Sequence, residues 1–289
     1  MKRLLNPVLG GLGFATTLAA APAPVDFREH LGLQLYSLRE MMRANEPGAL
    51  DLARSYGFTE IEGAGVNSLP PAEYLKGLAV RGLTLVSAGF GYEQLKKDCA
   101  AAVASARSLG VHYVMVAWIP HDESGLTAAE AHQAAADFNQ WGAAFRTAGI
   151  RFCYHPHGYE FIPFPAEQGR TAFDLLMRET KAEDVSFEMD VFWIYHAGQD
   201  PVELLKAYQG RWRLMHLKDL RRGAARGIIG GSRAPATDNV AVGDGEIDWK
   251  KVLATAQEVG VEHYFIEDET PDPQRCIPLS LKYLRTLKL

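Results

Sequence analysis

Short apolar runs alternate with segments of helical spacing along most of the chain. The apolar runs predict strands at residues 31–36, 58–62, 83–88, 111–118, 150–155, 185–190, 213–218 and 263–268. The helical spacing predicts helices at residues 47–56, 70–81, 92–109, 127–148, 171–180, 201–208, 248–259 and 278–287. Glycine follows several of these segments, as at Gly57, Gly110 and Gly260, where helices commonly end. The pattern therefore predicts eight strand–helix units.

Strands that alternate with helices indicate a parallel sheet, and eight such units favour a closed (β/α)8 TIM barrel over an open doubly wound sheet. A barrel of this kind needs about 250 residues, which suits a chain of 289. No Gly-x-Gly-x-x-Gly turn follows the first predicted strand, which argues against a dinucleotide-binding fold. Because no linker divides the chain, residues 27–289 are predicted to form one barrel domain.

Residues 1–23 have the pattern of a secretory signal peptide. Lys2 and Arg3 precede a weakly apolar run from Leu4 to Ala20, and no acidic residue occurs before Asp26. Proline and several glycines interrupt this run, which argues against a permanent membrane helix. We therefore expect an exported, periplasmic protein without a stable membrane anchor. A disordered tail rich in alanine and proline is the alternative.

The charge balance bears on the partners of the protein. The chain has 30 basic and 35 acidic residues, and loss of Lys2 and Arg3 would leave 28 against 35, a net charge of −7. An acidic protein is a poor nonspecific partner for nucleic acid. The chain has three cysteines, and an odd number without paired spacing predicts no disulfide framework. The acidic composition therefore argues against nucleic acid as a partner and is compatible with a small-molecule substrate.

Polar residues close four of the predicted strands. His155 and His157 stand one residue apart and share a face, because alternate residues of an extended strand point the same way. Asp190, His216 and Glu267 lie near the ends of three later strands. Active sites of such barrels lie at the carboxyl ends of the strands. The four strand ends therefore predict one metal site shared by four strands.

Six segments carry a family resemblance: GLQLYSLR at 32–39, YHPHGYEF at 154–161, EMDVFW at 188–193, HLKD at 216–219, VGDGEIDW at 242–249 and IED at 266–268. By these segments the chain resembles the xylose-isomerase-like TIM-barrel superfamily, a group of sugar isomerases and epimerases that also contains inosose dehydratases and endonuclease-type members. The resemblance runs from about Leu31 to the end of the chain. As a set these segments are specific for the superfamily, but they leave the reaction open.

The resemblance implies one divalent ion held by Glu, Asp, His and Glu from successive strands. Asp190, His216 and Glu267 fill the last three of these places. His155 stands where many relatives have glutamate, so either His155 binds the ion or Glu160 folds back from the following loop to do so. A mixed oxygen and nitrogen shell suits Mn²⁺, Zn²⁺, Co²⁺ or Fe²⁺ better than Ca²⁺.

Such an ion polarises a carbonyl and a neighbouring hydroxyl, and a positioned base then removes the adjacent proton. His157 is the first candidate for this base and Glu160 the second, while a role for His157 in orienting a ligand is the alternative. Lys218 is expected to bind a substrate oxygen or an anionic intermediate, or else to pair with Glu188. Residues expected to line the sugar pocket are Gln34, Glu62 and Trp193, the last of which could equally serve packing.

The reaction that we expect is isomerisation or epimerisation of a carbohydrate. A lyase or hydratase acting on keto-glycosides by β-elimination is the alternative, because both reactions begin with the same proton abstraction. Two further alternatives rank lower: a sugar-binding barrel without catalysis and an endonuclease of the same fold. An endonuclease would require ligands for further metal ions and a basic groove. A long loop between His216 and Asp248 carries Arg221, Arg222, Arg226 and Arg233. It could act as a lid or as a subunit contact, which leaves a homo-oligomer open.

Overall fold

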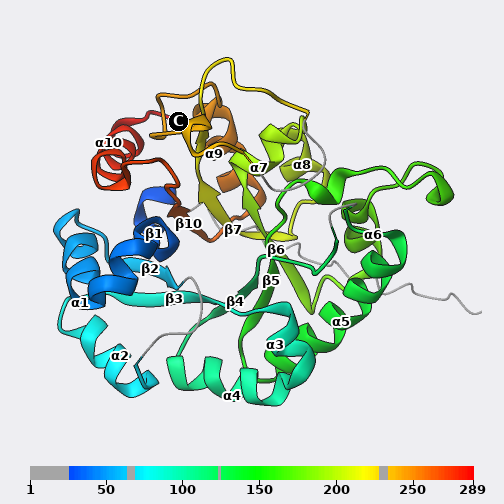
Figure 1. Ribbon diagram of the computed structural model, residues 1–289, viewed down its shortest axis with the longest axis horizontal. Coiled ribbons are helices and arrows are strands. Elements are labelled where there is room, and N and C mark those ends of the chain that lie inside the picture. Colours follow the sequence, from blue (N-terminus) through cyan, green and yellow to red (C-terminus); the bar gives the residue numbers. More distant parts are fainter. Residues whose placement is uncertain (1–25, 64–68, 123–124, 228–233) are drawn as a thin grey trace, which may run out of the picture.

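The computed structural model describes residues 26–63, 69–122, 125–227 and 234–289. Within that part of the chain, eight parallel strands close a barrel in the order β1-β10-β7-β6-β5-β4-β3-β2, and the helices surround it (Figure 1). The barrel strands are β1 (Leu31–Gln34), β2 (Glu60–Gly63), β3 (Thr84–Gly89), β4 (Tyr113–Val116), β5 (Arg151–Tyr154), β6 (Val185–Asp190), β7 (Trp212–Leu217) and β10 (His263–Ile266). The predicted TIM barrel is confirmed.

Longer helices connect the strands on the outside of the barrel. They are α1 (Arg39–Ser55), α2 (Pro71–Ala79), α3 (Tyr92–Lys97), α4 (Cys99–Leu109), α5 (Ala128–Thr147), α6 (Ala172–Glu179), α7 (Val191–His196), α8 (Pro201–Ala207), α9 (Trp249–Val259) and α10 (Pro273–Thr286). Short 3-10 turns occur at η1 (Phe27–His30), η2 (Leu35–Leu38), η3 (Tyr159–Phe161), η4 (Pro165–Glu167) and η5 (Ala236–Asp238). Within the long arginine-bearing loop, β8 (Asp219–Leu220) pairs antiparallel with β9 (Asn239–Val240).

Several predicted boundaries are wrong for local reasons. The first strand ends at Gln34, because the Gln34 side chain accepts a hydrogen bond from the backbone N–H of Tyr36 and starts η2. The predicted helix at 92–109 is two helices, because Asp98 leaves the helical conformation (φ −158°) and caps α4 through the N–H of Ala101. The helix predicted at 47–56 begins earlier, at Arg39, and is kinked at Asn45.

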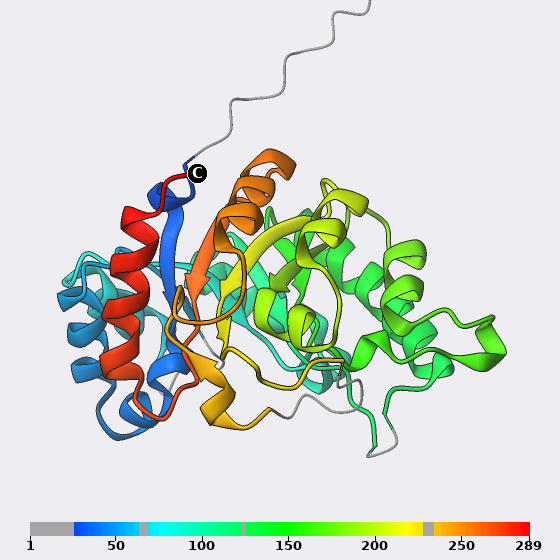
Figure 2. The same ribbon diagram turned by 90° about the horizontal axis from the view of Figure 1, so that it is seen from above.

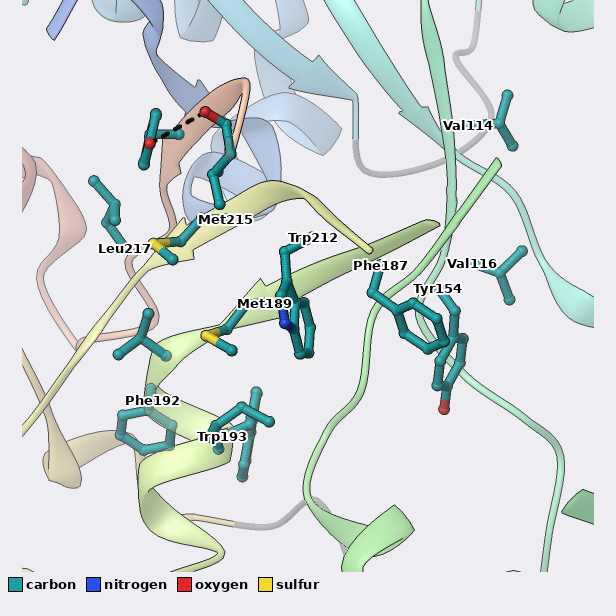
Figure 3. Packing of buried hydrophobic residues seen from close by; sticks show 14 of the residues in the cluster. Val114, Val116, Tyr154, Phe187, Met189, Phe192, Trp193, Trp212, Met215 and Leu217 are labelled. Carbon is teal, nitrogen blue, oxygen red and sulfur yellow. Dashed lines mark hydrogen bonds between the residues drawn. The ribbon is translucent and has the colours of Figure 1, made fainter. Parts of the chain in front are cut away.

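Side chains alternate between the outside and the inside of the barrel. Figure 3 shows Phe187 and Met189 of β6 in the outer apolar cluster. Inside the barrel a separate apolar layer is formed by Val86, Tyr113, Cys153, Leu214 and Phe265. A Cβ atom on Gly32 would lie 2.7 Å from the Phe265 ring, so glycine at this position makes room for that ring.

The two ends of the described chain lie side by side (Figure 2). The Arg28 guanidinium donates a hydrogen bond to the backbone carbonyl of Leu287, which ties the segment before β1 to the end of α10. Among the described residues, no helix combines the length and the apolar character that crossing a bilayer would need. The predicted signal peptide at residues 1–23 lies outside the described residues, as does Arg233.

Candidate functional site

Polar side chains close four neighbouring strands at the carboxyl end of the barrel. Asp190 is the last residue of β6, His216 lies in β7, and His155 and Glu267 directly follow β5 and β10. All four side chains are buried. His155, His216 and Glu267 each come two residues after a member of the inner apolar layer, so they continue the inward-facing register above it.

The polar atoms of these four residues converge. The His216 Nδ1 atom lies 3.3 Å from Glu267 Oε2 and 3.9 Å from Asp190 Oδ2, and His155 Nε2 lies 3.5 Å from Asp190 Oδ2. Two ligands of one ion with bonds of about 2.1 Å are roughly 3 to 3.5 Å apart. Among the described residues, Asp190, His216 and Glu267 form one group able to hold an ion. His155 belongs to an overlapping group with Glu188 and His216.

Several of these atoms have no hydrogen-bond partner in the described part of the protein. They are both ring nitrogens of His155, Oδ2 of Asp190 and Nδ1 of His216. Buried polar atoms are normally paired, so unpaired atoms that converge fit the ligand set of a cation. The structure thus brings the four predicted ligands together, and their role as ligands stays a prediction.

The other nitrogen of His216 is held from below. His216 Nε2 lies 2.6 Å from Glu62 Oε1 and 3.2 Å from Glu188 Oε1, and the Gln34 amide donates to Glu62 Oε1 at 2.5 Å. A proton on Nε2 leaves the Nδ1 lone pair free for an ion. Gln34 and Glu62 are fully buried. They therefore support His216, a position that differs from the pocket-lining one predicted for them.

Burial sets the ionisation of the cluster. Burial, aided by the charge of His216, holds the pKa of His155 well below its usual value. Burial also opposes a charge on His216, but the carboxylates of Glu188 and Glu267 outweigh it and raise the pKa of His216 well above its usual value. Burial and the neighbouring Glu62 raise the pKa of Glu188 to about 8. A cation would relieve the repulsion among these buried carboxyl groups.

His157 lies beside the cluster on the face predicted for it. Its ring centroid is 4.4 Å from that of His155 and 5.8 Å from that of Trp193. The His157 Nδ1 atom is 3.3 Å from the backbone oxygen of His155, which it can reach as a donor. Burial and the neighbouring His155 lower the pKa of His157 to about 3. The imidazole is therefore neutral at pH 7, with the Nε2 lone pair able to accept a proton.

Glu160 is engaged within its own turn. Its carboxylate accepts a hydrogen bond from the Tyr154 hydroxyl and is 3.1 Å from the backbone nitrogen of His157, which donates to it. Burial raises the pKa of Glu160 to about 7. Glu160 belongs to neither ligand group at this end of the barrel in the described residues. The geometry thus favours His155 over Glu160 in the first ligand place, and Glu160 positions the His157 backbone.

Lys218 extends along the inner wall toward three carboxylates. Its Nζ lies 3.4 Å from Glu267 Oε2 and 4.0 Å from Asp190 Oδ2, and it donates a hydrogen bond to Glu269. The suggested pairing with Glu188 is replaced by these contacts. The ammonium lies 5.0 Å from the ring centroid of Trp193, so Trp193 lies beside Lys218, and its role in a sugar pocket stays a prediction. Burial opposes the lysine charge, but Glu267 and Glu269 outweigh it and raise the pKa of Lys218.

Sequence reasoning missed the aromatic side chains at the mouth of the site. Trp118 follows β4, is 41% exposed, and stacks on His121 with ring centroids 4.4 Å apart. Its centroid is 6.3 Å from His157 and 4.9 Å from Tyr159. The available signal was the position of Trp118 at the carboxyl end of an apolar run, where barrel loops carry functional residues.

The fold and the cluster define a parallel α/β barrel with convergent, buried histidine and carboxylate side chains at the carboxyl ends of its strands. The family model of xylose isomerase-like TIM barrels matches residues 50–287. The chain belongs to this family, as its sequence resemblance predicts.

Relatives in this family are enzymes. An inosose dehydratase of Lacticaseibacillus casei is 27% identical over 168 residues, which are 54% of this chain and 53% of the relative. An inosose dehydratase of Clostridium botulinum (strain Alaska E43 / Type E3) is 25% identical over 230 residues, 71% of this chain and 75% of the relative. The chain thus spans about half the length of the first relative and three quarters of the second.

Solved structures share the fold. A sugar phosphate isomerase/epimerase from Parabacteroides distasonis ATCC 8503 superposes with a TM-score of 0.73 and 24% identity, covering 93% of this chain and 97% of that one. The IolI protein, whose crystal structure holds a zinc atom, gives a TM-score of 0.65 and 13% identity over 89% of this chain and 95% of its own. Because both sequence identities are below 25%, the similarity to these two structures establishes the fold and not the function.

Proposed function

We propose that this protein is a divalent-metal-dependent enzyme that removes a proton next to a carbonyl of a small carbohydrate. One observation carries the proposal. Unpaired, buried ligand atoms of His155, Asp190 and His216 converge beside His157, an imidazole whose low pKa keeps it neutral. Membership of a family whose relatives are named for reactions of sugars and cyclitols supports the substrate class.

His155 Nε2, Asp190 Oδ2, His216 Nδ1 and Glu267 Oε2 would hold the ion. When bound, it would supply Lewis acidity toward a substrate carbonyl. Mn²⁺, Zn²⁺, Co²⁺ and Fe²⁺ suit this mixed donor set. The zinc atom of the IolI protein belongs to a distant structural neighbour and supports a transition-metal ion in general terms.

The protein's own side chains supply the remaining parts of the reaction. His157 accepts the proton on Nε2, while its Nδ1 stays directed at the His155 carbonyl. Lys218 holds a fixed positive charge near the place where negative charge develops on oxygen. The rings of Trp193 and Trp118 offer apolar surfaces to the C–H face of a sugar ring.

Isomerisation or epimerisation follows if the proton returns to carbon. In isomerisation His157 would return the proton to the neighbouring carbon, while the hydroxyl proton moves to the former carbonyl oxygen. In epimerisation a second acid would have to supply a proton to the opposite face of the same carbon, and His157 would keep the first proton until it is released to solvent. A second candidate is a carbon–oxygen lyase, which the relatives named inosose dehydratase favour. There the C–H proton goes to His157, the C–O bond at the next carbon breaks, and the leaving hydroxyl takes up that proton from His157 and departs as water.

The experiment is incubation of the metal-loaded protein with keto-sugars, 3-keto-glycosides and a keto-cyclitol in D₂O, followed by NMR. Deuterium at one carbon without loss of a group indicates isomerase or epimerase activity, and an unsaturated product or a released aglycone indicates a lyase. Absence of both with every substrate would contradict the proposed reaction.

The metal is tested separately. Asp190→Asn and Glu267→Gln should lose the tightly held ion while their circular dichroism stays unchanged, since asparagine can still cap α7 as Asp190 does. Glu269→Gln is the matched control, because Glu269 contacts Lys218 but lies in neither of the two ligand groups at this end of the barrel among the described residues. Equal metal content in all three variants would rule out this ligand set.

A further inference from the structure

A second cluster of ligand-type side chains lies at the opposite end of the barrel. His30 precedes β1, Glu60 begins β2 and His263 begins β10, and these three strands are neighbours. Glu60 stands two residues before Glu62, and His263 stands four residues before Glu267, so both share the inward-facing register of the upper site. Phe265 lies between the two levels as part of the inner apolar layer. The two clusters are therefore separate sites in one barrel.

The three side chains converge closely. His30 Nδ1 lies 3.0 Å from Glu60 Oε1, and His263 Nδ1 lies 2.7 Å from Glu60 Oε2. One ring nitrogen of each histidine and one oxygen of Glu60 all lie within 4.8 Å of one another. The side chains of Glu60 and His263 are 17% and 16% exposed, and that of His30 is 37% exposed. They are thus held in place and still reachable by an ion from solvent.

A cavity opens beside this cluster. It has a volume of about 630 Å³, and Glu60 and His263 form part of its wall together with Tyr113, His112 and Arg151. The Tyr113 ring packs edge-on against His263 at 5.4 Å, which restrains the imidazole. An ion held by three protein ligands needs further donors, and a cavity of this size can supply water or a small anion.

The ionisation of Glu60 suits a cation. Burial raises its pKa, but hydrogen bonds from His263 and His30 outweigh burial and leave the pKa below its usual value. The carboxylate is therefore charged at neutral pH. Two imidazoles with one carboxylate form a donor set that binds zinc and other divalent transition metals, whereas Mg²⁺ and Ca²⁺ prefer oxygen ligands.

We propose that His30, Glu60 and His263 form a second binding site for a divalent transition-metal ion, with its open side toward the cavity at the amino ends of the strands. The competing explanation is a hydrogen-bonded clasp, in which each imidazole donates to one oxygen of Glu60 and no ion binds. The clasp accounts for the two short contacts of Glu60, but it does not explain why a cavity is open beside them. The following test separates the two explanations.

The test removes the upper site first. Chelator-treated His216→Gln/Glu267→Gln protein, in which both overlapping ligand groups of the upper site have lost His216, is titrated with Co²⁺ and with Zn²⁺. Binding is followed by calorimetry and by cobalt absorption. We expect one ion per chain in this background. When His263→Gln or His30→Gln is introduced into this background protein, metal affinity should fall by about tenfold to a hundredfold, because one ligand is lost. Glutamine can still donate to Glu60, so the fold should persist and is checked by circular dichroism.

His112→Gln is the matched control, because His112 lines the same cavity but lies outside the cluster. It should bind as the background protein does. No binding in the background protein, or unchanged binding in both His263→Gln and His30→Gln, would overturn the proposal and leave the clasp. Because the upper site is already disabled, neither result depends on the proposed enzymatic reaction.

Discussion

Replacement of His157 by asparagine separates proton abstraction from metal binding. The backbone N–H of residue 157 would still donate to Glu160, so the turn after β5 keeps its main tether. Asparagine is smaller than histidine and can still donate toward the backbone oxygen of His155. His157 lies in none of the ligand groups of the described residues. Metal content and circular dichroism should therefore match wild type.

The magnitude is that of removing a neutral, positioned imidazole. Burial and the neighbouring His155 lower the pKa of His157, so its ring is neutral at pH 7 and one ring nitrogen can accept a proton. A positioned general base contributes about 10² to 10⁴ in rate. Each factor of ten corresponds to about 1.4 kcal/mol, so His157→Asn should raise the barrier by about 3 to 5.5 kcal/mol.

Solvent-deuterium exchange into the substrate measures this step without later bond changes. The exchange rate should fall at least a hundredfold in His157→Asn with the ion retained. His121→Asn is the control, because His121 is a rim imidazole that stacks on Trp118, and it should stay within a few-fold of wild type. Exchange at the wild-type rate in His157→Asn would refute the assignment of the base. For His155→Asn we expect loss of the ion and of activity together.

Three further outcomes are expected. Trp118→Ala should raise KM about two- to tenfold with a smaller effect on kcat, and Trp118→Phe should restore most of the loss, because the ring is an exposed surface at the mouth of the site. Because burial raises the pKa of Glu160 from 4.5 to about 7, the folded protein keeps a proton that the unfolded chain releases. Stability should therefore fall by up to about 3 kcal/mol as pH rises from 4.5 to 7, and urea unfolding of Glu160→Gln should lack this component. We also propose that residues 1–23 direct export, so mass spectrometry of protein from the native host should find a start between Ala20 and Asp26, and an intact Met1 in cytoplasmic protein would contradict this.

The barrel and the level of the site could be predicted because both depend on short-range periodicity. Alternation with period two fixes the face of each strand residue, and parallel strands bring their carboxyl ends together. This is why His155, Asp190, His216 and Glu267 could be grouped from sequence. The same rule placed His157 next to His155, where the structure has it.

The supporting contacts could not be predicted because they depend on depth and on distant partners. Alternation places Gln34 and Glu62 on the inner face but does not tell whether they meet substrate or another side chain. Glu62 contacts His216, 154 residues away in sequence. Glu160 lies in a turn whose path lets its carboxylate meet a backbone N–H of its own segment. Such contacts depend on the exact closure of the barrel, which local sequence does not encode.

The inner apolar layer explains how one barrel can carry polar clusters at both ends. Gly32 lets the Phe265 ring lie across the interior, and His263 and Glu267 project from the same strand below and above it. A packed layer excludes water between the clusters, and sites without shared partners act independently. The free energy of metal binding at the upper site should therefore change by no more than about 0.5 kcal/mol in His263→Gln. The same limit should hold for metal binding at the His30, Glu60 and His263 cluster in Glu267→Gln. A larger coupling would mean that the layer transmits strain from one end of the barrel to the other.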